Sequence, residues 1–196
     1  MSKLIITGAT GTGHFWSLSP EPQNDVADVG LGVYLAGFAA YLAALADPSV
    51  SYITLLLRRE IPSWANLPSS ASEKSKTIIV KDFADYPKDV ISQVADHEGC
   101  VWALGTSVRG ISEEDYMKIH VDFPIAAVEA LKKAGVGNTE KPFNFVYVGG
   151  EGADPTQKSV FLWARGKVRN IYIEKVFSPF AGSRCGWASF VGSRRG

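Results

Sequence analysis

The sequence KLIITGATGTG, from Lys3 to Gly13, decides the fold of this chain of 196 residues. The apolar run from Leu4 to Ile6 predicts a buried β-strand. The glycines after it predict a sharp turn, because glycine lets backbone N–H groups come close to a ligand. Such a turn, followed by a helix N-terminus, can hold a pyrophosphate. We therefore predict a nucleotide site, with a plain strand–turn–helix connection as the alternative. The predicted contacts are Gly8, Thr10, Gly11 and Gly13.

Composition narrows the class of protein. The chain is 46% hydrophobic, enough for a sizeable core, and carries 20 basic and 20 acidic residues. A balanced charge does not attract nucleic acid or anionic lipid over a long range, so we expect no nucleic-acid partner. The two cysteines form no disulfide framework, and a strand begins almost at Met1, which leaves no room for a signal peptide. We expect a cytoplasmic protein. The three histidines are scattered and predict no metal site.

The segment after the glycine turn breaks the expected pattern. A dinucleotide-binding loop runs directly into a helix, whereas residues 14–28 contain Pro20, Pro22 and several acids that oppose a helix. Helix-compatible sequence resumes at Val29 and continues to Ala46. This uncharged segment is also almost long enough to span a membrane, but it is rich in alanine and glycine and lacks flanking Lys or Arg. A buried helix is our prediction and a membrane segment the alternative.

A second buried strand is predicted over residues 51–57, and it ends in Arg58 and Arg59. At this point of a dinucleotide-binding domain, an acid suits the ribose hydroxyl of NAD and an arginine suits the 2′-phosphate of NADP. Two arginines therefore favour NADP over NAD. The alternative is a solvated basic loop.

Further strands and helices alternate along the chain. A short strand over 77–80 precedes Asp82, which is predicted either to reach the adenine or to cap the next turn. A short helix is predicted over 87–95. A fourth strand follows over 100–104. Leu104 at the end of this strand and the following Gly105 and Thr106 are predicted to line the cofactor crevice.

The last predicted units complete the fold class. A long helix is expected over 113–134, with Ser112 as its N-cap and a kink at Pro124. A fifth strand is expected over 143–148, followed by Gly149 and Gly150. The alternation predicts an α/β doubly wound parallel sheet, incomplete at its C-terminal edge because residues 177–196 show no clear strand. We expect a Rossmann domain over 1–175 and an irregular tail over 176–196.

Five sequence segments together resemble one family. They are ITGATG at 6–11, ALGTSVRG at 103–110, the helix with Tyr116 and 122–124, FNFVYV at 143–148, and GEGADPTQKS at 150–159. The chain resembles the atypical short-chain dehydrogenase/reductases of the HIV Tat-interacting oxidoreductase-like group and its fungal relatives, over roughly residues 1–11 and 35–175. The resemblance implies an NADP-binding Rossmann domain in which a Ser, a Tyr and a Lys act on a small carbonyl or alcohol substrate.

The chain departs from that family pattern in its catalytic positions. The family's Ser position falls on Gly149 or Gly150, and its Tyr position falls on Trp163, four residues before Lys167. An indole N–H cannot exchange a proton with an alcohol. Lys167 is the only expected catalytic residue that is retained, and the resemblance assigns it to the nicotinamide ribose.

The glycine loop departs from the family as well. Joining Gly11 to Leu35 gives GATGLAGFAAYLAALADPSV, an uninterrupted loop and helix with Gly37 as the third glycine. Residues 12–34 therefore have the character of an insertion, such as a translated intron. Two hypotheses stay open: an NADP-dependent oxidoreductase, and a non-catalytic cofactor-binding regulator or degenerate fragment. The oligomeric state is not indicated by the sequence.

Overall fold

A computed structural model describes residues 2–10, 31–63, 65–106, 110–137, 142–150 and 185–190. Its strands are β1 (Ser2–Thr7), β2 (Val50–Leu57), β3 (Ser75–Ile79), β4 (Gly99–Trp102), β5 (Asn144–Gly150) and β6 (Cys185–Phe190). Its helices are α1 (Leu31–Ala46), α2 (Ala71–Lys74), α3 (Lys88–Ser92), α4 (Glu113–Met117), the π-helical turn η1 (Lys118–Asp122) and α5 (Phe123–Lys133).

The described strands form one parallel sheet in the order β3-β2-β1-β4-β5-β6. The chain moves outward from β1 to β3 and then returns to place β4 on the other side of β1. This reversal is the topological switch point at which open α/β sheets bind ligands. The predicted fold class, a doubly wound parallel sheet, is confirmed.

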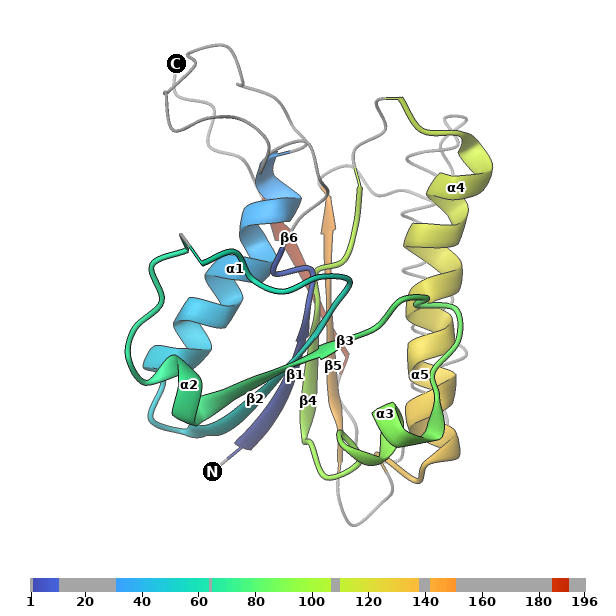
Figure 1. Cartoon of the computed structure of the whole chain (residues 1–196). Coiled ribbons are helices and arrows are strands. Elements are labelled where there is room, and N and C mark those ends of the chain that lie inside the picture. The colour runs from blue at the N-terminus through green and yellow to red at the C-terminus, as the bar shows by residue number, and fades with distance from the viewer. Residues whose placement is uncertain are drawn as a thin grey trace, which may run out of the picture.

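Helices cover both faces of the sheet (Figure 1). One face packs against α1, where Tyr41 contributes a fully buried ring. The other face packs against α3 and α5 and contains most of the buried aromatic rings. Burial on both faces explains why β1 and β2 have apolar runs instead of alternating patterns. The core residues with the largest buried side chains are Trp102, Tyr41, Tyr116, Tyr147, Phe83 and Phe145.

The sixth strand corrects one expectation. No strand is predicted after residue 177, and that prediction is wrong: β6 pairs in parallel with β5, from Phe145 beside Cys185 to Gly150 beside Phe190. β5 itself continues through Gly149 and Gly150, which the sequence places after the strand.

The long helix differs from its prediction in one place. Ser112 is its N-cap, as predicted, and its hydroxyl accepts a hydrogen bond from the Asp115 N–H at 3.1 Å. Gly135, with φ +79°, ends it in the left-handed conformation. The helix also contains a π-helical turn, η1, immediately before α5, which the sequence did not predict, and the kink expected at Pro124 stays a prediction.

Candidate nucleotide-binding site

The turn after β1 is built against the end of β4. Gly8 has φ +75°, and a Cβ at this position would lie 2.1 Å from the Ala103 carbonyl oxygen. The Thr7 hydroxyl accepts a hydrogen bond from the Ala103 N–H at 3.1 Å, and Thr7 is fully buried. Only glycine satisfies both the left-handed backbone and this close approach. The two strands on either side of the switch point therefore meet at Gly8.

Helix α1 approaches the same turn through Gly37. A Cβ on Gly37 would lie 2.6 Å from the Gly8 carbonyl oxygen and 2.9 Å from that of Thr7. This is the close helix–strand contact that the third glycine of a dinucleotide-binding loop makes. The geometry thus fits Gly37 as the third glycine, although residues 11–30 intervene in the sequence and lie outside the described part.

The other predicted contacts follow neighbouring strands. Arg58 and Arg59 come directly after β2 and are exposed, and 104–106 follow β4 after one intervening residue, Ala103. Because β2, β1 and β4 are adjacent and parallel, their carboxyl ends share one edge of the sheet. Thr10 lies in the turn and is 5% exposed. The structure therefore brings these predicted residues to one edge.

Asp82 lies at the same edge, beyond β3. Its carboxylate is exposed and accepts a hydrogen bond from the Ala84 N–H at 2.9 Å. This local contact is the turn-capping role that the sequence left open as the alternative to an adenine contact.

Four predicted site residues lie outside the described residues: Gly11, Gly13, Trp163 and Lys167. Gly149 and Gly150 form the last two positions of β5 and pair with Ser189 and Phe190 of β6. The two glycines thus end their strand at the same edge as the other predicted contacts.

The sequence did not single out His120, which contacts this edge. Its Nε2 lies 3.2 Å from both the N and the O of Thr106, and its Nδ1 lies 3.3 Å from the Tyr147 hydroxyl. His120 is 4% exposed. The sequence signal for it is Pro124, four residues later, because a proline alters the turn of helix that precedes it.

A second buried histidine marks the opposite edge. His97 lies two residues before β4 and contacts Thr54 through Nε2 at 2.9 Å and Asp96 through Nδ1 at 3.0 Å. Burial lowers the pKa of His97, with the Asp96 carboxylate opposing the shift. The Lys3 ammonium donates to Asp96, which lowers the pKa of that carboxyl. This cluster lies at the amino ends of the strands and away from the predicted nucleotide contacts.

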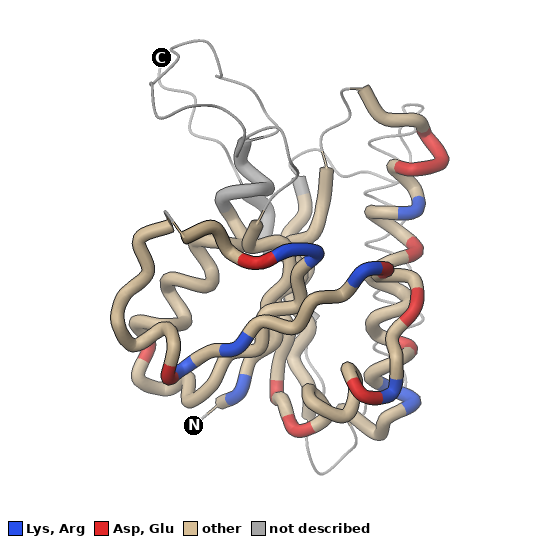
Figure 2. Tube along the Cα trace, in the orientation of Figure 1, with Lys and Arg blue, Asp and Glu red and all other residues tan. Residues whose placement is uncertain are grey.

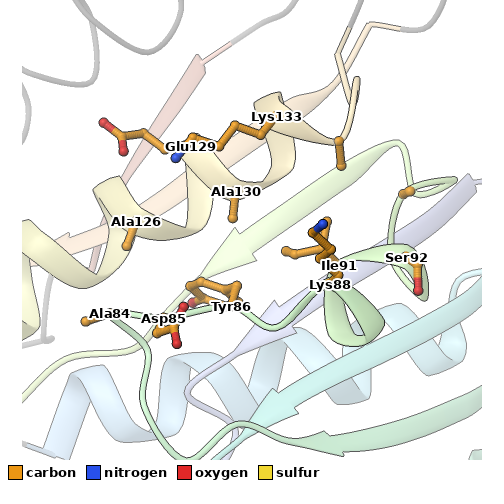
Figure 3. Close-up of a pocket in the computed structure, with 12 residues that line it drawn as sticks. Ala84, Asp85, Tyr86, Lys88, Ile91, Ser92, Ala126, Glu129, Ala130 and Lys133 are labelled. Atoms are coloured by element: carbon orange, nitrogen blue, oxygen red, sulfur yellow. The ribbon is translucent and has the colours of Figure 1, made fainter.

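A cavity of about 690 Å³ lies between α5 on one side and α3 with the segment before it on the other (Figure 3). Alanines of α5 form one wall and Tyr86 lies opposite them, and Lys88 and Glu129 also line the cavity. The Tyr86 hydroxyl is buried with no hydrogen-bond partner among the described residues, and burial raises its pKa. Since none of its lining residues is a predicted cofactor contact, this cavity is distinct from the candidate site.

Charge and metal ligands add little to the site. Figure 2 shows basic and acidic residues interspersed along the described trace. Within the described ranges, no three His, Cys, Asp or Glu residues are grouped as metal ligands.

None of the helices described here has the length and apolar character needed to cross a bilayer. Cys100 is buried in β4, which raises the pKa of its thiol.

Comparison with known proteins identifies the fold. No family model matches the chain. The leucinostatins biosynthesis cluster protein T of Purpureocillium lilacinum is 27% identical over 132 residues, which cover 67% of this chain and 45% of that protein. This chain therefore spans less than half the length of that relative.

Solved structures match almost the whole chain in fold, although their sequence identity to it is low. A nucleoside-diphosphate-sugar epimerase from Agrobacterium tumefaciens matches with a TM-score of 0.61 at 13% identity, over 96% of this chain and 51% of that one. A dTDP-glucose 4,6-dehydratase from Streptomyces venezuelae, with NAD bound, matches with a TM-score of 0.58 at 15% identity, over 96% and 55%. A short-chain dehydrogenase/reductase from Vibrio parahaemolyticus matches with a TM-score of 0.55 at 17% identity, over 95% and 79%. The chain has the Rossmann fold that these proteins share.

Proposed function

We propose that this chain is an NADP-binding, oxidoreductase-like protein whose cofactor lies across the carboxyl ends of β2, β1 and β4. The observation that carries the proposal is the three-way contact of Gly8 with Ala103 and Gly37. It packs strand, turn and helix as closely as a pyrophosphate-binding loop requires, at the point where the strand order reverses. The NAD complex of the structurally similar dehydratase supports the choice of a nicotinamide dinucleotide.

Each predicted residue then has a place along the dinucleotide. The pyrophosphate lies against the glycine turn, and the exposed guanidinium groups after β2 meet the 2′-phosphate, for which arginine is suited by its charge and planar geometry. Asp82, which caps the local turn through Oδ1, lies nearest the adenine. The segment after β4 lies on the nicotinamide side of the switch point. The full set is Gly8, Thr10, Gly11, Gly13, Arg58, Arg59, Asp82, Leu104, Gly105 and Thr106.

The chemistry follows from the resemblance noted in the sequence. When bound, NADPH supplies a hydride for the reduction of a carbonyl. Lys167 holds the nicotinamide ribose, while Trp163 cannot donate the proton that the product alcohol needs. Gly149 and Gly150 offer no hydroxyl to orient a carbonyl. Water or another side chain has to supply the proton if the protein is active.

A second function is favoured by those same missing groups. A chain that keeps the nucleotide cradle but lacks the hydroxyls for proton transfer suits a non-catalytic regulator that senses NADP, or a degenerate fragment of the enzyme. The two functions share the binding step and differ in turnover.

One experiment separates these outcomes. Purified protein is titrated with NADPH and NADH while the fluorescence of its five tryptophans is followed, and turnover is measured on a panel of small aldehydes and ketones. Saturable NADPH binding with turnover that Lys167→Ala abolishes supports the oxidoreductase. Binding without turnover supports the regulator. Absence of binding to either nucleotide contradicts both.

We also propose that residues 12–34 are an insertion in the connection between β1 and α1. The proximity of Gly37 to Gly8 supports this, because the third glycine normally follows the first within a few residues. Helix α1 starts at Leu31, so the last four residues of the proposed insertion are helical. The intron origin is tested by comparing the transcript with genomic DNA over these codons. A gene without an intron at this point would contradict it.

A further inference from the structure

Pro124 shapes the helix that passes the nucleotide site. Proline has no N–H, so it cannot donate to the carbonyl four residues earlier, which belongs to His120. The turn before it is π-helical, and the Phe123 N–H donates to the Lys118 carbonyl, five residues back. One wide turn accommodates the proline with α-helix on both sides of it. α4, η1 and α5 therefore follow one another without a break from Glu113 to Lys133.

This wide turn places His120 at the end of β4. Its ring lies 4.1 Å from that of Tyr116, centroid to centroid, at an angle of 31°. Tyr116 is fully buried and Tyr147 is 2% exposed. The imidazole is therefore fixed on one side by the Tyr116 ring and at Nδ1 by the Tyr147 hydroxyl. Its Nε2 reaches the Thr106 backbone, in the segment after β4.

Either neutral tautomer of His120 makes a hydrogen bond to Thr106. With a proton on Nδ1, the ring donates to the Tyr147 oxygen and accepts from the Thr106 N–H. With a proton on Nε2, the ring donates to the Thr106 carbonyl and accepts from the Tyr147 O–H. In both arrangements the backbone of Thr106 stays attached to the helix.

The same segment is attached to the glycine turn at its other end. Ala103 donates its N–H to the Thr7 hydroxyl, and its carbonyl lies against Gly8. The three residues from Leu104 to Thr106 thus run between two fixed points. One point is the pyrophosphate loop and the other is His120.

We propose that His120 is a positioning residue that holds 104–106 in place for the nicotinamide half of the dinucleotide. This inference rests on the proposed function. The strand order places the adenosine half over β2 and the other half beyond β4, because the two halves bind on opposite sides of the switch point. Loss of the His120 contact therefore weakens binding of the nicotinamide half and leaves the adenosine half unaffected.

The test measures two dissociation constants by calorimetry, one for NADPH and one for adenosine 2′,5′-bisphosphate, which represents the adenosine half alone. We expect His120→Ala to raise the Kd for NADPH about fivefold, the value of one hydrogen bond, and to leave the bisphosphate Kd unchanged. His120→Gln places an amide near the position of Nε2 and should restore the affinity for NADPH. If His120 had a purely structural role, His120→Ala would weaken the binding of both ligands alike, and His120→Gln would not restore it.

His97→Ala is the matched control. His97 is 6% exposed and also bonds through both ring nitrogens, but at the opposite edge of the sheet. Its removal should lower the thermal stability and leave the Kd for NADPH unchanged. Equal weakening of NADPH by His97→Ala and His120→Ala overturns the inference.

The remaining outcomes are also decisive. If the wild-type protein binds both ligands and the His120→Ala variant binds NADPH equally tightly, the inference is overturned and the proposed function stands. Wild-type protein that binds neither ligand overturns both. If His120→Ala does not fold, Tyr147→Phe removes only the hydroxyl at Nδ1 and should show a smaller loss, again for NADPH alone. Unchanged affinity of Tyr147→Phe for NADPH then overturns the inference.

Discussion

The hydroxyl of Thr7, at the end of β1, accepts a hydrogen bond from the backbone N–H of Ala103, just beyond β4. A side chain here replaces a backbone acceptor at the point where the ladder between the two strands has ended. Both residues are buried, so water cannot take over if the hydroxyl is removed. The Ala103 N–H therefore depends on the Thr7 Oγ1 for its hydrogen bond.

Replacing Thr7 by Val should destabilise the fold. Valine has nearly the same shape, but it leaves the Ala103 N–H buried without a partner, which costs about 1–3 kcal/mol. Urea unfolding of Thr7→Val should show this loss, and Thr7→Ser, which keeps the hydroxyl, should recover most of it. Equal stability of the Val and wild-type proteins would contradict the role given to the hydroxyl.

Gly8→Ala should be much more destabilising than Gly135→Ala. The two glycines have almost the same left-handed backbone, φ +75° and +79°, so the conformational cost of an added Cβ is matched. Only at Gly8 does that Cβ meet backbone, whereas Gly135 has open space around it. Overpacking against a rigid neighbour should add about 2 kcal/mol to the Gly8→Ala loss. Chemical denaturation of the two variants gives the difference directly, and similar losses would argue against the contact with Ala103.

Stability should fall as the pH falls below about 6.5, the ordinary pKa of histidine. Burial lowers the pKa of His97 in the folded protein. As the pH falls, His97 is therefore protonated in the unfolded chain before it is protonated in the fold, and this stabilises the unfolded chain relative to the fold. The contribution is fully present above the unfolded pKa and is lost at lower pH. Unfolding free energies of wild type and His97→Gln, measured between neutral and mildly acidic pH, should show a shallower slope for the variant. Parallel curves would rule out His97 as the source.

Arg58→Ala and Arg59→Ala should change the choice of nucleotide. A guanidinium bound to the 2′-phosphate contributes a charge-assisted hydrogen bond of about 1.5–3 kcal/mol, so losing it should weaken NADPH binding by at least about tenfold. NADH has no such phosphate and serves as the control within each variant. The ratio of the two dissociation constants is the measurement. A ratio unchanged in both single variants and in the double variant would indicate a solvated loop.

The strands around the switch point were predictable because burial on both faces requires apolar runs such as 51–57. Arg58 and Arg59 could be placed for the same reason, since residues directly after a parallel strand lie at the carboxyl edge of the sheet. β6 was not predictable from CGWASF, because a strand with Gly and Ser at its positions depends on its pairing with β5. His120 was missed because its contact needs the π-helical turn, whereas Pro124 alone indicated only a bend.

The contact between Gly37 and Gly8 bears on how this gene could change. The free energy of closing a flexible loop grows only with the logarithm of its length, about 0.6 kcal/mol for each doubling. A connection lengthened between these two glycines can therefore keep the same docking of α1 on β1 at small expense. Extra codons at this junction would therefore change the stability of the sheet little and would be selected against only weakly. Extra codons between Thr7 and Gly8 would instead disrupt the docking of α1 on β1.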